Sequence, residues 1–330
     1  MPKDERIYKF EISHRTIIFT VFFLLFLKLL WLAYDILFSL FIAFIIMSAV
    51  KPLVERLEKL KFPRSLATIL VFFTLFFLIG YGFYWFFPPL IFEFLIFSKN
   101  FPSIIQKLIP NLNELINFSS FSQYLPNVTN QLFNVVKSIF SNAIFVISTI
   151  FFSFYFVLEE RFIKKLLINF FEEKRAEKIE NIFKKVEKRL QAWFWGELFL
   201  MFLVGILTFI GLTAIGVKYA LFLAIVAGLL EVVPNLGPVL STVPAVIVAF
   251  SQSYFLGLST IALYFIVQQL ENNLIVPLVM KKAVGLNPIV TLIALLVGGK
   301  LGGVLGVLLA IPFTLFVEVI LMEIIKEKNN

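Results

Sequence analysis

Long apolar runs recur along nearly all of the 330-residue chain, and most are close to the length that a bilayer crossing needs. The chain is 60% hydrophobic and 15% charged, with a mean hydropathy of +0.95. In hydrocarbon every backbone N–H and C=O needs an internal partner, so these runs are expected to be helices. The sequence therefore predicts an all-α polytopic membrane protein whose surroundings are the lipid bilayer.

In a soluble chain the net charge of +8 would suggest binding to nucleic acid, but in this apolar chain the membrane explains it. Lys and Arg gather between apolar runs, as at Lys281-Lys282, and such positive segments stay in the cytoplasm. This pattern predicts that both termini are cytoplasmic and gives no reason to expect a nucleic-acid partner. The apolar run at 16–34 lacks a small-residue cleavage site, so we expect it to remain as the first helix.

About eight helical membrane segments are expected. The third, 65–87, should end at Pro88-Pro89, because paired prolines stop a helix. The second should run past Pro52, since 36–50 alone would be short for a crossing. The full set is 16–34, 36 to about 57, 65–87, 139–158, 192–215, 219–233 with 239–255, 256–280, and 286–299 with 303–325.

Four parts of the chain follow from this pattern. Residues 1–89 hold membrane helices 1–3, and 90–138 form an extracytoplasmic insert of amphipathic helices. Residues 139–191 hold membrane helix 4 and a charged cytoplasmic helix, and 192–330 are a C-terminal transport region with interrupted helices. The charged helix carries an apolar stripe at Ile179, Ile182, Phe183, Val186 and Leu190.

The C-terminal part is interrupted by a group of residues that break or cap helices. These are Glu231, Pro234, Asn235, Gly237 and Pro238. Irregular backbone and a carboxylate are costly in lipid, so the break is expected to lie where something polar binds or passes. The alternative is that the carboxylate only caps the next half-helix.

The apolar runs before each interruption are short, which favours re-entrant helical hairpins at 219–255 and 286–325. Their inverted orientation would match transporters that place two broken hairpins around the substrate. A hairpin and a pair of full crossings both begin and end on the same side of the membrane. The distribution of Lys and Arg therefore cannot distinguish them, and two full crossings stay the alternative for each segment.

A second polar group lies inside the segment 256–280. Gln268, Glu271 and Asn272 would share one face of a regular helix, with Gln269 and Asn273 on the adjacent face. Amides with a carboxylate suit a hydroxyl-rich neutral solute or a cation held by oxygens. Hydrogen bonding between helices is expected to explain one or two of the five.

The last hairpin is rich in glycine around Lys300, which would face a ligand at the tip or extend to an interface. Small residues at this spacing indicate close helix packing, with hinge motion as a second interpretation. Glu197, Glu318 and Glu323 are expected to be interfacial. The candidate hinge and packing residues are Pro277, Gly298, Gly299, Gly302, Gly303, Gly306 and Pro312.

The sequence contains no zinc motif, nucleotide-binding P-loop or Ser/His/Asp set, and it has no Cys. We therefore expect no enzymatic activity, no cofactor and no metal. The absence of a P-loop also excludes an ATP-driven pump within this chain, so transport would be secondary or passive.

Four motifs make the chain resemble the autoinducer-2 exporter (PerM-like) family of prokaryotic membrane transporters. The hydropathy pattern extends the resemblance over nearly the whole chain, although Asn235 stands where members commonly have a bulkier aromatic residue. The motifs are Glu231-x-x-Pro234-Asn235-x-Gly237-Pro238, Gln268-Gln269-x-Glu271-Asn272-Asn273-x-x-x-Pro277, Gly285-Leu-Asn-Pro288, and Gly298-Gly299-x-x-Gly302-Gly303-x-x-Gly306 running to Pro312.

The resemblance implies a homo-oligomer, a pentamer, in the plasma (inner) membrane, with substrate crossing inside each protomer. It also implies export of the quorum-sensing signal autoinducer-2, a small polar furanose-like molecule, or Na⁺(Li⁺)/H⁺ antiport. Secondary export of a small polar solute is the leading prediction. Antiport through Glu231 or Glu271 is the alternative, and a non-transporting membrane scaffold is a third hypothesis of a different class.

Overall fold

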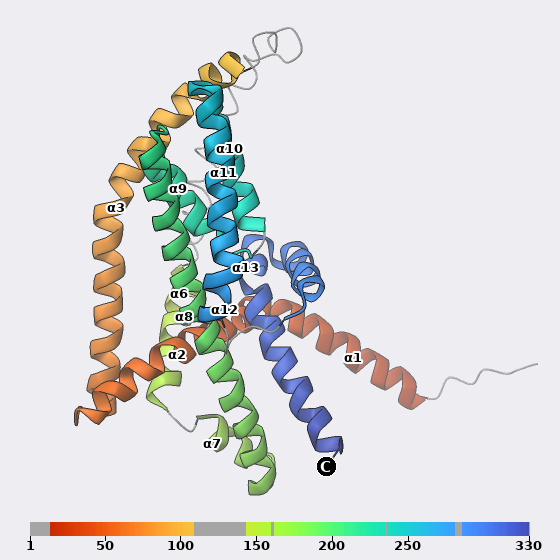
Figure 1. The fold of residues 1–330 in the computed structure, drawn as a ribbon. Helices are drawn as coiled ribbons and strands as arrows, with labels where there is room; N and C mark the ends of the chain where they lie inside the picture. The colour runs from red at the N-terminus through yellow and green to blue at the C-terminus, as the bar shows by residue number, and fades with distance from the viewer. Residues whose placement is uncertain (1–13, 109–142, 160–161, 235, 281–285, 330) are drawn as a thin grey trace, which may run out of the picture.

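The computed structural model describes residues 14–108, 143–159, 162–234, 236–280 and 286–329, and within these ranges it contains helices and no strand. Four of the described helices are long and apolar enough to cross a membrane, and three shorter apolar helices accompany them. Figure 1 shows the helices in an elongated arrangement. The predicted all-α polytopic membrane fold is confirmed.

The first two helices, α1 (His14–Leu32) and α2 (Tyr34–Lys59), meet at Ala33, whose N–H donates to the Leu29 carbonyl at 2.9 Å. Figure 1 shows α1 projecting away from the other helices, and its described side chains are almost all exposed. A helix that is apolar on every side suits lipid or a partner rather than its own core. As predicted, α2 continues through Pro52.

The third helix does not end where the sequence predicts. α3 spans Arg64–Leu108 and contains Pro88, Pro89 and Pro102, so the expected end at Pro88-Pro89 is wrong. Proline removes one hydrogen-bond donor and crowds the preceding turn, which can bend a helix without ending it. Figure 1 shows α3 curving over the molecule. The start of the predicted insert is thus a continuation of α3, and its remainder lies outside the described residues.

The next helices are α6 (Ala143–Leu158), α7 (Phe162–Ile168) and α8 (Glu173–Ile215). In α8 the charged segment and the following apolar segment form one helix, where the sequence predicts two segments meeting at residue 192. α6 packs against α2 through a buried 2.8 Å hydrogen bond between the Ser39 and Thr149 hydroxyls. Such hydroxyl pairs are typical of contacts between membrane helices.

The first predicted hairpin consists of α9 (Ala220–Leu230) and α10 (Leu236–Gln252), separated by the expected break. The two helices share one core cluster, in which Leu223 and Ala227 pack with Ala245 and Val248. The start of α9 is fixed to α3, because the Glu93 carboxylate accepts a 2.8 Å hydrogen bond from the Phe222 N–H.

The segment predicted as one helix over 256–280 has three parts. They are α11 (Tyr254–Leu270), a π-helix η1 (Glu271–Ile275) and the single turn α12 (Val276–Val279). The Val276 N–H donates to the Glu271 carbonyl, five residues back, as a π-helix requires. This irregular turn falls within the polar group that the sequence singles out.

The last helix, α13 (Pro288–Asn329), is folded back on itself at Gly303, which has φ +57° and ψ −136°. Residues with a side chain rarely adopt this conformation. The two halves meet at Gly298 and Gly306, because a Cβ placed on Gly306 would lie only 1.9 Å from the Gly298 carbonyl oxygen. The second predicted interruption is therefore a tight helical hairpin.

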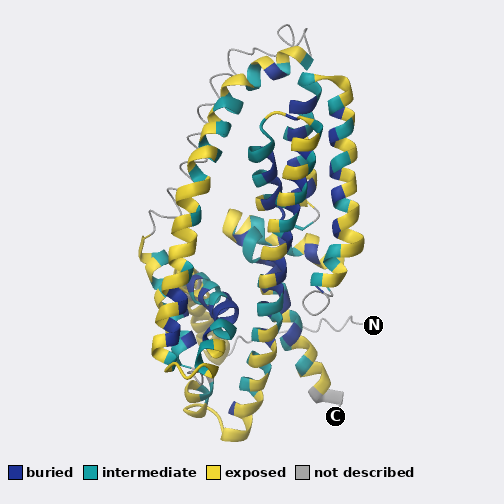
Figure 2. Ribbon diagram, turned by 60° about the vertical axis from the view of Figure 1, so that its left-hand side comes forward, coloured by how far each residue is buried: buried dark blue, intermediate teal, exposed yellow. Residues whose placement is uncertain are grey.

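Buried residues concentrate along the middle of the molecule, and the outer faces of the long helices are exposed (Figure 2). The larger core cluster joins α2, α3, α8 and α13, and a smaller one joins the far end of α8 to α9 and α10. The exposed faces are rich in Phe, Leu and Ile, as lipid-facing surfaces are.

Candidate carboxylate site

Three carboxylates from different segments are buried in the interior. Glu197 lies in α8, Glu231 at the end of α9, and Glu271 at the first position of η1. Their exposed fractions are only 4%, 2% and 5%. Buried acidic groups are usually paired with a base, yet within the described residues none of the three forms an ion pair.

The three carboxyl groups act on one another. Glu231 and Glu271 share a side-chain hydrogen bond, and Glu197 interacts electrostatically with both. The Gln268 amide donates to Glu271 at 3.4 Å. Within the described part of the chain, one oxygen of Glu197 and one of Glu231 have no hydrogen-bond partner. Two carboxyl groups share a hydrogen bond only when a proton lies between them, so this arrangement is compatible with one shared proton.

The break after α9 fixes the position of Glu231. The chain turns back through the Gly237 N–H, which donates to the Val233 carbonyl at 2.8 Å. A Cβ on Gly237 would lie 2.0 Å from the Leu230 carbonyl oxygen, so only glycine allows this approach. Among the described residues, no α10 N–H bonds to the Glu231 carboxylate, which speaks against a simple capping role.

The polar residues that the sequence groups together differ in burial, and the π-helix begins among them. Glu271 is buried and Gln268 is half-buried, whereas Gln269, Asn272 and Asn273 are exposed. The predicted polar face is not buried as a unit, since Asn272 is exposed beside the buried Glu271. The π turn, which contains an extra residue, then shifts the helical phase of the residues that follow Glu271. A regular 3.6-residue period therefore fails at this point.

Glu197 is the site residue that the sequence prediction misses, since it is buried rather than interfacial. Its backbone is held close to α12, because a Cβ on neighbouring Gly196 would lie 2.7 Å from the Met280 sulfur. The signal for its burial was the apolar stripe of the charged helix. Extended at the same spacing, that stripe continues through Leu190, Trp193, Glu197, Leu200 and Val204, all of which are buried.

A row of buried hydroxyls continues from the carboxylates between α8 and α11. Contacts of Gly196 with Met280 and of Gly211 with Leu263 show that α8 runs antiparallel to α11 and α12. On the facing sides, the hydroxyls of Thr208, Thr260 and Tyr264 are buried, and no hydrogen-bond partner for them lies in the described segments. Unsatisfied buried polar groups are costly, so their alignment needs an explanation.

The other predicted residues lie in several places. Pro234 is half-buried, Gly237 and Pro238 are buried at the break, and Asn235 lies outside the described residues. Lys300 is exposed on the α13 hairpin, and within the described segments no ion pair joins it to the three carboxylates. Gly299 and Gly302 are half-buried in that hairpin, Pro312 is buried in its second half, and Pro277 is exposed in α12.

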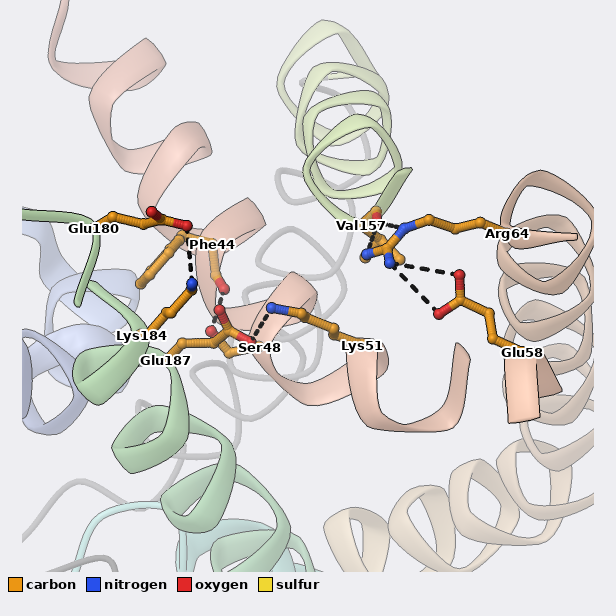
Figure 3. A network of polar contacts seen from close by, with 9 residues as sticks. All are labelled: Phe44, Ser48, Lys51, Glu58, Arg64, Val157, Glu180, Lys184 and Glu187. Carbon is orange, nitrogen blue, oxygen red and sulfur yellow. Dashed lines mark hydrogen bonds and ion pairs between the residues drawn. The ribbon is translucent and has the colours of Figure 1, made fainter. Parts of the chain in front are cut away.

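Several charged residues elsewhere form ion pairs, in contrast to the carboxylate cluster. Figure 3 shows Lys51 bound to Glu187 at 2.7 Å, and Arg64 bound both to Glu58 and to the Val157 carbonyl that ends α6. At the start of α8, a hydrogen bond from Lys164 holds the pKa of Glu177 below its ordinary value. Among the described residues, no group of His, Cys, Asp and Glu has the arrangement of a metal site.

Comparison with known proteins matches the chain to a family of membrane transporters and to several relatives, each named "Putative transport protein". A family model described as "AI-2E family transporter" matches residues 17–326. "Putative transport protein YueF" of Bacillus subtilis is 30% identical over 313 residues, which cover 88% of this chain and 84% of the relative. "Putative transport protein YrrI" of the same organism is 23% identical over 95% of both chains, and "Putative transport protein YhhT" of Escherichia coli is 35% identical over 33% of this chain.

Proposed function

Because this multi-pass membrane protein belongs to the AI-2E family of transporters, we propose that it exports a small polar solute by proton-coupled secondary transport. The family resemblance favours a solute like autoinducer-2. The observation that carries the proposal is the cluster of Glu197, Glu231 and Glu271, which is buried and has no basic partner among the described residues.

A proton-coupled role fits the chemistry of this cluster. An unpaired carboxylate at membrane depth costs ~2.5 kcal/mol or more, so such groups are retained chiefly where they serve a transport function. The cost falls when a proton neutralises one of two adjacent carboxyl groups. Since Glu231 lies at the break of the α9–α10 hairpin and Glu271 at the start of η1, movement of that hairpin relative to η1 would change the separation of the two carboxyl groups and thereby their hold on the proton.

The row of unpartnered hydroxyls supports a polar route that leads away from the carboxylates. Thr208, Thr260 and Tyr264 offer donors and acceptors to a hydroxyl-rich solute or to water. We place the solute path along this row and across the break, with Pro234, Asn235, Gly237 and Pro238 shaping its inner end. Gln269, Asn272, Asn273 and Lys300 are exposed, and we propose that they line the path only within a homo-oligomer.

The proposal predicts that flux depends on the proton gradient and on Glu231. Purified protein in liposomes should move the solute up its gradient when a pH gradient is imposed, and Glu231→Gln should lower that rate by at least about tenfold, which corresponds to ~1.4 kcal/mol. The exposed Glu173→Gln is the matched control and should transport normally. Equal rates for Glu231→Gln and the wild-type protein would exclude the residue from coupling.

The second candidate function is Na⁺(Li⁺)/H⁺ antiport. It is favoured by the chemistry of the site, because carboxylate oxygens that lack partners can bind a hard monovalent cation in place of a proton. Vesicles loaded with a pH-sensitive dye distinguish the two functions. Sodium-driven proton movement without added solute supports antiport, and silence from pH 6 to 9 together with solute flux supports export.

A further inference from the structure

A second candidate binding site lies apart from the carboxylate cluster, where the hydrophobic core meets the charged part of α8. It is a cavity of about 290 Å³ between α2, α6, α7, α8 and α13. Its lining divides into two chemically distinct parts. The apolar part consists of Leu40, Phe41, Phe44, Met47, Phe156, Phe183 and Phe316, and the charged part of Lys51, Glu159, Lys164, Glu180, Lys184 and Glu187.

The apolar part is a group of aromatic rings packed edge to face. Phe316 lies at the centre, with ring centroids 5.7 Å from Phe41, 6.4 Å from Phe44 and 6.1 Å from Phe183. These rings come from three helices far apart in the sequence, and they offer no hydrogen-bonding group. A polar solute would gain nothing from such a surface, whereas a hydrocarbon chain would.

The charged part has three ammonium groups and three carboxylates, so it carries no net charge. Figure 3 shows the Lys51–Glu187 and Lys184–Glu180 pairs beside Phe44. Each ammonium has three N–H donors, and among the described residues Lys184 pairs with one carboxylate, that of Glu180, at 2.9 Å. Lys184 is also about half exposed, so it can bind a further oxygen without breaking this pair.

We propose that the cavity binds one phosphatidylethanolamine molecule from the cytoplasmic leaflet, with an acyl chain on the aromatic rings and the headgroup on the charged part. The phosphate accepts hydrogen bonds from Lys184 and Lys164, and the ammonium donates to Glu180 or Glu159. Net neutrality of the lining favours a zwitterionic headgroup over an anionic one, because an anionic lipid has no cation to face the three lining carboxylates. Phosphatidylcholine fits less well, since its quaternary ammonium has no N–H to donate.

Native mass spectrometry of the full-length protein tests this proposal. The protein is exchanged into detergent with equal amounts of phosphatidylethanolamine, phosphatidylcholine and phosphatidylglycerol that carry identical acyl chains. One phosphatidylethanolamine per chain should be retained, at about tenfold the level of either competitor, which corresponds to a tenfold affinity ratio. Equal retention of the three lipids would overturn the proposal, as would an apolar segment of a second chain occupying the cavity.

Two variants separate the parts of the site. Phe316→Trp fills the cavity and should abolish retention, whereas Phe313→Trp, on the same helix but lining a different cavity, should leave retention unchanged. Lys184→Gln alters an exposed side chain and should fold normally, while weakening retention of all three lipids. Unchanged phosphatidylethanolamine retention in Lys184→Gln would refute headgroup binding even if Phe316→Trp failed to fold.

Discussion

Glu197 shows why a single acidic residue in an apolar helix is difficult to assign from sequence. It stands next to two tryptophans near the start of an apolar segment, a position typical of a membrane interface. Its position around the helix axis decides its burial, because Glu197 lies on the same side of α8 as the buried apolar stripe. Glu231 and Glu271 were found because sequence breaks or other polar residues surround them, whereas Glu197 has no such marker.

Glu197→Gln is expected to reduce proton-coupled flux as strongly as Glu231→Gln. The three carboxyl groups interact directly, so they should hold the proton as a unit and their effects should not add. The double variant Glu197→Gln/Glu231→Gln should therefore be no slower than either single variant, within about twofold. Flux into liposomes under a fixed pH gradient measures this. Rates that multiply would show that Glu197 acts independently.

The helices themselves were largely predictable, because apolar length and flanking charge identify a membrane segment whatever its neighbours are. Two local features of the helices could not be predicted, namely where α3 ends and whether the helix after residue 270 is regular. The prolines at 88 and 89 predict a helix end, but α3 continues through them. The sequence predicts a regular helix over 256–280, but η1 shifts the helical phase after residue 270. In both cases tertiary packing decides whether a local irregularity ends, bends or rewinds the helix, and one sequence does not contain that information.

Pro277 offers a test of what the π turn contributes. In a regular helix its nitrogen would face the Asn273 carbonyl, but proline has no N–H and its ring crowds that carbonyl. Pro277→Ala should let the segment relax to an α-helix and turn Glu271 by about 100° relative to the residues that follow it. Flux should fall at least about tenfold while thermal stability is kept or raised, as fluorescence-detected unfolding would measure. Pro102→Ala in α3 is the matched control, and wild-type flux in Pro277→Ala would show that the π turn is dispensable.

The α13 hairpin depends on close approach of its two halves, which can be tested at Gly306. A Cβ at this position would lie 1.9 Å from the Gly298 carbonyl oxygen, and backbone atoms cannot move aside cheaply. Gly306→Ala should therefore lower the free energy of unfolding by about 1–3 kcal/mol. In Gly82→Ala on α3 the Cβ meets nothing within 4 Å, so that variant should be neutral or slightly stabilised. Equal stability of both variants, measured by denaturant titration in detergent, would mean that the hairpin opens freely.

The molecule as a whole contains three helix interruptions that lie far apart in the sequence: the break after α9, the π turn η1 and the fold at Gly303. α8 is one rod of 43 residues that carries Glu197 along its apolar part and is bound at its charged end to other helices. Lys51 of α2 pairs with Glu187, and Arg189 pairs with Glu318 of α13. The sequence predicts the break at 231–238, the interruption within α13 and the charged helix. It predicts neither η1 nor the single continuous helix that links the ion pairs to the site.

Breaking the Lys51–Glu187 pair should therefore change both the stability of the protein and the behaviour of the distant carboxylate site. Both side chains are about 85% buried, so Lys51→Gln leaves a carboxylate without its partner and should cost about 1–3 kcal/mol. The double variant Lys51→Gln/Glu187→Gln should recover about 1 kcal/mol of that loss. Lys165→Gln, in an exposed pair, should cost less than about 1 kcal/mol. If α8 transmits the change, Lys51→Gln also alters the pH dependence of flux while Lys165→Gln does not; identical pH profiles would show that the ion pairs serve stability alone.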